Sequence, residues 1–176
     1  MLAQTVRVRM ETQLGVIDID VDEAHAPVTA GYFMKYVDGG LYDGGAFHRT
    51  VKPDNQPQSK IRIQVVQAGI NPDRRGRELA PVTLERTSQT GLKHLDGVIS
   101  MARSGPDSAT SDFFICIGDQ PSLDFGGMRN PDGQGFAAFG RVVQGMDVVR
   151  RIQQAPAEGQ NLKPAAPIVA VRRVGR

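Results

Sequence analysis

The stretch GGAFHRTV at residues 44–51 places a histidine directly before an arginine. The chain contains only three histidines, so the pair His48–Arg49 is a natural candidate for chemistry. Neither side chain is placed to act as a covalent nucleophile, and no metal-ligand spacing surrounds them. Two interpretations follow: an electrostatic pair in an active site, or two polar residues on the outer face of an ordinary strand.

The usual catalytic constellations are missing from the sequence. His25, His48 and His94 fall in a helix entry, a strand and a loop, without the spacing of zinc ligands, so we expect no metal site. Cys116, the single cysteine, sits in the apolar run FFICI, which predicts a buried and inert thiol. There is no Gly-x-Ser-x-Gly motif and no phosphate-binding glycine loop. Covalent and metal-dependent catalysis are therefore not expected.

Strand parity indicates a more specific grouping. Side chains alternate between the two faces of a strand, so residues two apart share a face. By this rule Phe47 shares a face with Arg49, Val65 with Gln67, and Asp112 with Phe114. If these faces converge, Arg49 and Gln67 border an apolar shelf. The shelf would consist of Val65, Phe114 and Leu123. The alternative is that the apolar residues are plain core and that Arg49 lies on a solvated exterior.

Short strands must position these side chains. Residues 6–10 and 17–21 alternate between apolar and polar on both sides of a glycine-containing turn, which predicts an antiparallel hairpin. A helix is expected from Pro27 to the Gly39-Gly40 pair, and another over residues 145–154. The other expected strands are 46–51, 61–67, 97–101, 112–117, 137–143 and 168–173. Residues 52–60 and 126–135 have the composition of inserted loops.

Many short strands and few helices favour a mainly β fold. We expect a closed eight-stranded antiparallel β-barrel capped by two α-helices, rather than a parallel α/β sheet. The length of 176 residues fits a single domain over residues 1–176, with no internal repeat.

Composition limits the partners and the compartment. The formal net charge is +2 and the arginines are scattered, so we expect no nucleic-acid partner. No stretch approaches the roughly 18 apolar residues of a membrane span, so we expect no membrane partner. We also expect a monomer. The first residues, MLAQ, are compatible with a cytoplasmic protein or with the remnant of a trimmed signal, so the bacterial periplasm and the cytoplasm both stay open.

Five ordered blocks resemble a known family. They are FHR at 47–49, QAG at 67–69, SMA at 100–102 with GP at 105–106, SDFFIC at 111–116 and FGRVVQGMDVV at 139–149. Their order, over residues 6–174, resembles the cyclophilin-type peptidyl-prolyl cis/trans isomerases, particularly the bacterial branch. The resemblance implies an eight-stranded antiparallel barrel with two helices and catalysis of rotation about Xaa–Pro bonds, without a cofactor. The expected partners are proline-containing peptides and unfolded or folding proteins.

The resemblance also implies roles for individual residues. Arg49 would be the catalytic residue, because a planar and permanently charged guanidinium can stabilise the twisted peptide bond as its charge localises. Gln67 would hydrogen-bond the substrate backbone. The complete substrate-binding set that it implies is Phe47, His48, Val65, Gln67, Ala102, Arg103, Asp112, Phe114, Leu123 and Phe136.

Several positions depart from the residues that the family usually carries. Val65 stands in place of a larger apolar residue, Ser122 in place of an aromatic residue, and Phe136 in place of a histidine or tyrosine. Two departures are charged: Arg103 replaces an asparagine and Asp112 replaces a glutamine.

Asp112 leaves two hypotheses open. It could pair with Arg103 and restore a neutral rim, or pair with Arg49 and compete with the substrate carbonyl. The loop at residues 52–60 could extend the groove or be a tolerated surface insertion. For the whole chain, the rival to an enzyme is a non-catalytic module that binds proline-containing peptides as a chaperone would.

Overall fold

The computed structural model describes residues 4–175, and strands dominate the fold. The strands are β1 (Thr5–Thr12), β2 (Gly15–Asp22), β3 (Ala46–Val51), β4 (Val65–Gly69), β5 (Val98–Met101), β6 (Phe113–Cys116), β7 (Ala138–Gln144), β8 (Ala157–Glu158) and β9 (Asn161–Arg173). The helices are α1 (Pro27–Asp38), α2 (Thr87–Thr90) and α3 (Met146–Gln153). Two 3-10 helices, Pro72–Arg77 and Pro121–Leu123, interrupt the connecting loops.

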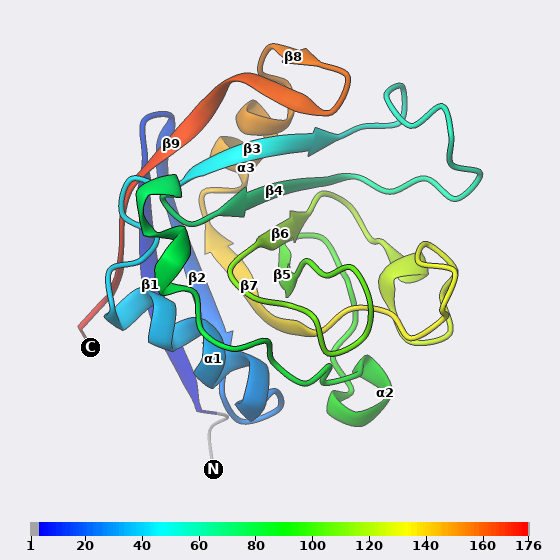
Figure 1. Ribbon diagram of the computed structural model, residues 1–176, viewed down its shortest axis with the longest axis horizontal. Helices are drawn as coiled ribbons and strands as arrows, with labels where there is room; N and C mark the ends of the chain where they lie inside the picture. The colour runs from blue at the N-terminus through cyan, green and yellow to red at the C-terminus, as the bar shows by residue number, and fades with distance from the viewer. Residues whose placement is uncertain (1–3, 176) are drawn as a thin grey trace.

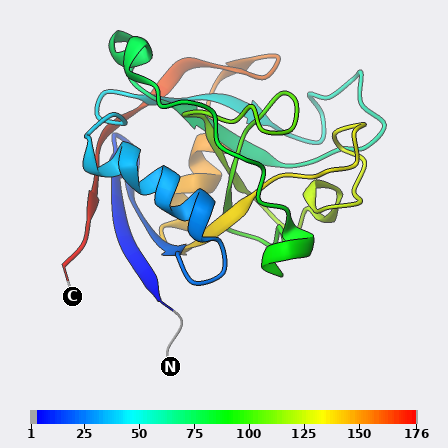
Figure 2. The same cartoon turned by 60° about the horizontal axis from the view of Figure 1, so that its bottom comes forward.

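The strands close into a barrel (Figure 1). They follow the order β1-β2-β7-β5-β6-β4-β3-β9, and β1 also pairs with β9, so eight strands form a ring. The two-residue strand β8 pairs only with β9. Every pairing is antiparallel. Figures 1 and 2 show α1 and α3 at opposite ends of this ring. The predicted eight-stranded antiparallel barrel with two capping helices is therefore confirmed.

The barrel interior holds the main hydrophobic core. In β2, the alternating residues Ile17, Ile19 and Val21 are fully buried, as the hairpin pattern predicts. Helix α1 inserts Phe33 into this core, where its ring lies 4.9 Å from that of Phe139 between centroids. Replacing such a buried aromatic residue by alanine typically costs about 3–5 kcal/mol, so this contact fixes α1 on the barrel.

A second, smaller hydrophobic cluster lies on the outside of the barrel wall. It consists of Val51, Ile63, Val65, Phe114, Cys116 and Leu123, with Ala102 and Phe136 packed against it. Strand β4 separates the two clusters by alternation. Val66 and Ala68 belong to the interior core, whereas Val65 belongs to the outer cluster. The outer cluster gives this face of the wall an apolar floor.

Strand β4 begins later than the predicted strand at 61–67. The buried side chain of Gln56 explains the difference. Its Nε2 donates to the carbonyl of Ile63 at 2.8 Å, and its Oε1 accepts from the amide of Ile63 at 3.0 Å. Both backbone groups of Ile63 are thus occupied by a side chain, so they cannot join a strand ladder.

Strand β9 begins seven residues before the predicted start at residue 168, at Asn161. The early part contains Pro164 and Pro167, which lack an amide hydrogen and are disfavoured in strands. It is nevertheless paired, since Phe47 lies opposite Ala166. The predicted strand started too late because proline composition, a local signal, is overridden here by pairing with β3.

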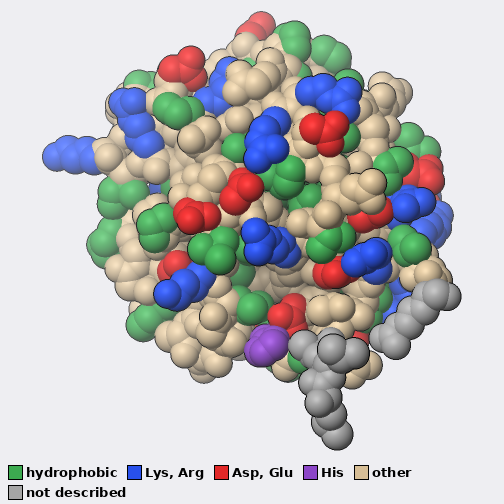
Figure 3. Space-filling view, turned by 180° about the vertical axis from the view of Figure 1, so that it is seen from behind, with side chains coloured by type: hydrophobic (Ala, Val, Ile, Leu, Met, Phe, Trp, Pro, Cys, Tyr) green, Lys and Arg blue, Asp and Glu red, His purple; other side chains and the backbone are tan. Residues whose placement is uncertain are grey.

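Charges on the outer surface are matched across strands. Arg7 contacts Asp20 at 2.8 Å and Arg9 contacts Asp18 at 2.9 Å, in line with the antiparallel register of β1 and β2. Seen from behind Figure 1, cationic and anionic side chains are interspersed over the surface (Figure 3). No helix within residues 4–175 has the length and apolar character needed to cross a bilayer.

Candidate active site

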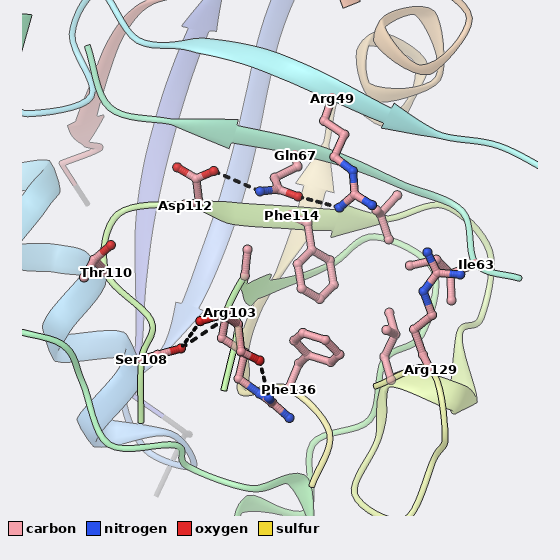
Figure 4. Close-up of a pocket in the computed structure, with 14 residues that line it drawn as sticks. Arg49, Ile63, Gln67, Arg103, Ser108, Thr110, Asp112, Phe114, Arg129 and Phe136 are labelled. Atoms are coloured by element: carbon pink, nitrogen blue, oxygen red, sulfur yellow. Dashed lines mark hydrogen bonds between the residues drawn. The ribbon is translucent and has the colours of Figure 1, made fainter. Parts of the chain in front are cut away.

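A pocket of about 340 Å³ opens over the outer hydrophobic cluster (Figure 4). Its apolar floor and walls come from β4, β6 and the loops around them. The lining residues are Arg49, Ile63, Val65, Gln67, Ala102, Arg103, Ser104, Ser108, Thr110, Asp112, Phe114, Leu123, Arg129 and Phe136. This volume is within the range of small-ligand sites, about 300–1,000 Å³.

Phe114 forms the centre of the floor. Its ring meets Phe136 edge to face, at 5.6 Å between centroids and an angle of 87°. Beneath it the imidazole of His94 stacks nearly parallel, at 6.0 Å and 14°. His94 is fully buried, and its two ring nitrogens lie 2.7 Å from Asp124 and 2.9 Å from Ser100. Nothing in the spacing of the histidines indicated that His94 would support the site, because the contact joins a loop to a strand.

A β-bulge at His48 overturns the predicted parity of β3. Phe47 pairs with Ala68 and Arg49 pairs with Gln67, so His48 is an extra residue without its own partner in β4. Phe47 therefore points into the barrel core with no exposed surface, whereas Arg49 points outward into the pocket. The prediction that Phe47 shares a face with Arg49 and contacts the substrate is wrong, because the bulge shifts the alternation by one residue.

A row of polar side chains runs along the outer face of the wall. Arg49 Nη1 donates to Gln67 Oε1 at 2.9 Å, and Gln67 Nε2 donates to Asp112 Oδ2 at 2.9 Å (Figure 4). His48 Nε2 lies 3.0 Å from the same Asp112 oxygen. An arginine can only donate and a carboxylate can only accept, so these neighbours fix which way the amide of Gln67 points. His48 does not line the pocket but reaches the row from its edge.

The electrostatics of the row follow from burial and hydrogen bonding. Burial lowers the pKa of Arg49, although a guanidinium remains charged at any physiological pH. Burial by itself would raise the pKa of Asp112, but the hydrogen bonds from His48 and Gln67 outweigh it and lower the pKa. The row therefore carries a fixed cation at one end and a carboxylate at the other, separated by a neutral amide.

Both hypotheses for Asp112 are wrong. Its partners are His48 and Gln67, and it reaches Arg49 only through the amide between them. Strand β6 pairs Phe114 with Gln67, which brings Asp112 to this edge. Gly69 leaves room for the carboxylate there, since a Cβ at that position would collide with it.

Arg103 is committed elsewhere. Its side chain is 1% exposed and binds Asp132 with both terminal nitrogens, at 2.9 and 3.0 Å. It also donates to the carbonyl of Gly135 and stacks over Phe136, 4.8 Å from the ring centroid. The loop at residues 126–135 supplies these partners, so Arg103 fastens that loop to the wall formed by Phe136.

Most of the predicted site residues meet in the pocket. Arg49, Val65, Gln67, Ala102, Arg103, Asp112, Phe114, Leu123 and Phe136 line it, whereas Phe47 and His48 do not. Ile63 was missed, although its parity with Val65 and Gln67 could have indicated it. Arg129 was also missed, because it lies in an irregular loop where no periodicity applies. The segment at residues 52–60 contacts the pocket wall through this residue, since Arg129 Nη1 donates to Gln56 Oε1 at 2.7 Å.

The pocket has no ligand set for a metal. Within residues 4–175, no group of three or more His, Cys, Asp or Glu side chains is arranged to hold an ion. What the pocket offers instead is an apolar floor beside a row of fixed hydrogen-bond donors and acceptors. Such a site can hold a small ring and polarise a neighbouring carbonyl group.

Comparison with known proteins identifies the family. The family described as cyclophilin type peptidyl-prolyl cis-trans isomerase/CLD matches residues 7–175. The chain belongs to this family. It is 36% identical over 170 residues to peptidyl-prolyl cis-trans isomerase A of Dickeya dadantii, covering 94% of this chain and 82% of that protein. It is 35% identical over 167 residues to the isomerase cyp18 of Streptomyces antibioticus, covering 92% and 93%. This cyclophilin is thus a peptidyl-prolyl cis-trans isomerase with bacterial relatives.

Solved structures agree on the fold. A cyclophilin type isomerase of Cryptosporidium parvum superposes with a TM-score of 0.76 at 19% identity, covering 98% of this chain and 99% of that one. A second crystal structure of that protein, in the presence of the dipeptide ala-pro, gives a TM-score of 0.74 at 18% identity, covering 97% and 99%.

Proposed function

We propose that this cyclophilin isomerises Xaa–Pro bonds in the pocket over the outer hydrophobic cluster, with Arg49 as its catalytic residue. The observation that carries the proposal is the position of Arg49. Its guanidinium lines the pocket beside the floor formed by Val65 and Phe114. A proline ring on that floor would place the preceding carbonyl next to a permanent positive charge.

The energetics of the reaction suit this arrangement. The cis and trans forms of an Xaa–Pro bond differ by about 0.5–1 kcal/mol but are separated by roughly 18–20 kcal/mol. The barrier arises because twisting localises the nitrogen lone pair and ends its delocalisation into the carbonyl. Donors that interact more strongly with the twisted amide than with the planar one lower the barrier, rather than only improving binding.

Arg49 is held ready for that role. Its Nε donates to Gln160 Oε1 at 2.8 Å and its Nη1 donates to Gln67 Oε1 at 2.9 Å. Within the described chain, Nη2 has no hydrogen-bond partner and stays available to a substrate. Two anchored nitrogens fix the plane of the guanidinium, so little reorganisation is needed when the bond twists.

Gln67 binds the substrate backbone, and Asp112 positions Gln67. The carboxylate takes one Nε2 hydrogen of Gln67 and leaves the other for a substrate carbonyl. His48 supports the carboxylate from outside the pocket. In this assignment Asp112 is a positioning residue, because it acts through Gln67.

The proposed substrates are proline-containing peptides and proline segments of unfolded or folding proteins. The apolar floor beside a row of hydrogen-bonding side chains supports this choice, since the floor suits a proline ring and the row suits a peptide backbone. The crystal structure of the Cryptosporidium parvum isomerase in the presence of the dipeptide ala-pro fits the same class of ligand. We further propose that the protein acts as a monomer, because ring closure leaves no long strand edge for a second copy among residues 4–175.

The test measures kcat/KM for cis-trans exchange in a blocked Ala-Pro peptide by NMR exchange spectroscopy. Arg49→Ala should lower kcat/KM by about 10²–10³-fold, the usual effect of losing a transition-state donor. Arg62→Ala is the matched control, because Arg62 is exposed and does not line the pocket. Activity of Arg49→Ala within threefold of the wild type would remove Arg49 from the catalytic role. A wild type that binds the peptide without accelerating exchange would contradict the proposed reaction.

A further inference from the structure

The pocket carries an uncompensated positive charge. Three arginines line it, and Asp132 neutralises Arg103 through the two hydrogen bonds described above. The acidic lining residue, Asp112, faces His48 and Gln67. Within residues 4–175, neither Arg49 nor Arg129 forms an ion pair. A ligand entering the pocket therefore meets two guanidinium groups, neither of which is paired directly with a carboxylate of the described residues.

Arg129 is held in place by neutral groups. Its Nη1 donates to Gln56 Oε1 at 2.7 Å, to Ser59 Oγ at 3.0 Å and to the Ile61 carbonyl at 2.7 Å. All three acceptors lie in the segment after β3, and the side chain of Gln56 is itself buried. Within the described chain, Nε and Nη2 of Arg129 have no partner. The side chain is thus fixed by one nitrogen and keeps two for a ligand.

The two free cations belong to one site. Both side chains line the pocket, and Figure 4 shows their guanidinium groups on the same side of it, with Ile63 beside Arg129. Burial lowers the pKa of Arg129, and the positive charge of Arg49 lowers it further. Because both guanidinium groups line the same pocket, an anion between them would interact with both.

We infer that Arg129 is a specificity-determining residue that selects Xaa–Pro segments with an aspartate or glutamate side chain within two residues of the proline. The inference rests on the proposed function, because it assumes that the proline ring occupies the floor beside Arg49. From there, an extended chain advances about 3.3–3.6 Å per residue, so one or two residues carry a side chain across the pocket. A carboxylate suits a guanidinium because its two oxygens can accept two parallel N–H groups.

The experiment compares matched peptides of the form acetyl-Ala-Ala-Pro-Ala-Ala-amide. One alanine at a time is replaced by glutamate or by its neutral isostere glutamine, which covers two positions on each side of the proline. The readout is the ratio of kcat/KM for the glutamate peptide to that for the glutamine peptide, from NMR exchange at low salt. For the wild type we expect a ratio of about 5 at one position at least, as for a partly exposed ion pair.

Variants assign the preference to Arg129. In Arg129→Gln the ratio should fall to about 1, whereas Arg129→Lys should keep part of it because lysine preserves the charge. Arg62→Gln, in the segment after β3 that holds Arg129 but outside the pocket lining, should keep the wild-type ratio. A defect in the loop structure would lower kcat/KM for both peptides and leave their ratio unchanged. A change in the ratio therefore reports the effect of the Arg129 charge alone. Arg129→Met replaces the glutamine variant if that protein does not fold.

Two results would overturn the inference: a wild-type ratio near 1 at all four positions, or a preference that survives in Arg129→Gln. Salt provides a second check, since a preference carried by charge must shrink as ionic strength rises. The glutamine peptides separate this inference from the proposed function. If they are isomerised with the expected dependence on Arg49, the reaction stands and only the selectivity fails.

Discussion

Replacing Asp112 by alanine tests whether Asp112 acts on Gln67 rather than directly on Arg49. The structure places Asp112 next to Gln67, with Arg49 one hydrogen bond further on. Losing the carboxylate should therefore loosen Gln67 and leave the second anchor of Arg49, on Gln160, in place. We expect a modest fall in kcat/KM rather than a rise.

The size of the effect follows from the contact that is lost. A hydrogen bond to a charged group is worth about 1.5–3 kcal/mol. The side chain of Asp112 is 38% exposed, so water replaces part of that interaction and about 1 kcal/mol is the appropriate figure. At 25 °C this corresponds to a fall of about fivefold in kcat/KM. Asp112→Asn should lie between the wild type and the alanine variant, since an asparagine oxygen can still accept from Gln67.

A double-mutant cycle with Gln67→Ala shows whether Asp112 acts through Gln67. If it does, Asp112→Ala should have almost no effect once Gln67 is absent. The assay is cis-trans exchange in the blocked Ala-Pro peptide, with thermal unfolding measured on every variant. Asp54→Ala is the control, because Asp54 is an exposed carboxylate that does not line the pocket.

Two outcomes would refute this reasoning. A rise in kcat/KM for Asp112→Ala would mean that the carboxylate restrains Arg49 and competes with the substrate. An equal fall with and without Gln67 would mean that Asp112 acts by another route, such as its contact with His48.

Three further predictions concern the support of the site. His94→Ala should lower the free energy of unfolding by about 2–4 kcal/mol, because it opens a cavity under Phe114 and removes one buried and one partly buried hydrogen bond. Urea unfolding measures this free energy, and a loss below about 1 kcal/mol would contradict the prediction. Burial would raise the pKa of Asp124, but hydrogen bonds from His94 outweigh it and lower the pKa. A lowered pKa means that ionised Asp124 stabilises the fold above about pH 4, and that this contribution is lost as the pH falls below that value. The gap in Tm between the wild type and Asp124→Asn should therefore close on acidification, and a constant gap would refute the assignment. Cys116 is buried and burial raises its pKa, so iodoacetamide should label it only after unfolding; rapid labelling of the native protein would disagree.

Local patterns in the sequence determined the barrel and the family. Alternation in the first hairpin predicts which residues of β2 enter the core, because side-chain direction in a regular strand depends only on parity. The five ordered blocks identify the family and bring Arg49, Gln67 and Phe114 into the list of site residues. These signals can be read from the sequence because each one depends only on residues that are close together in the chain.

Register and long-range contacts were decided by the tertiary structure. One extra residue at His48 separates Phe47 from Arg49, and parity cannot show such a bulge because it is a property of the pairing with β4. The partners of Asp112 were mispredicted for a similar reason. Charge alone makes an arginine the obvious choice, but the pairing of β4 with β6 brings Gln67 nearer.

The loops carried the least information in the sequence. His94, under the floor, and Arg129, in the pocket lining, both lie in irregular segments, where no periodicity relates a residue to its neighbours in space. Their positions depend on hydrogen bonds to residues 30 or more positions away. The local pattern of the chain therefore specifies its barrel and points to Arg49, whereas the packing of loops against the wall decides what surrounds that arginine.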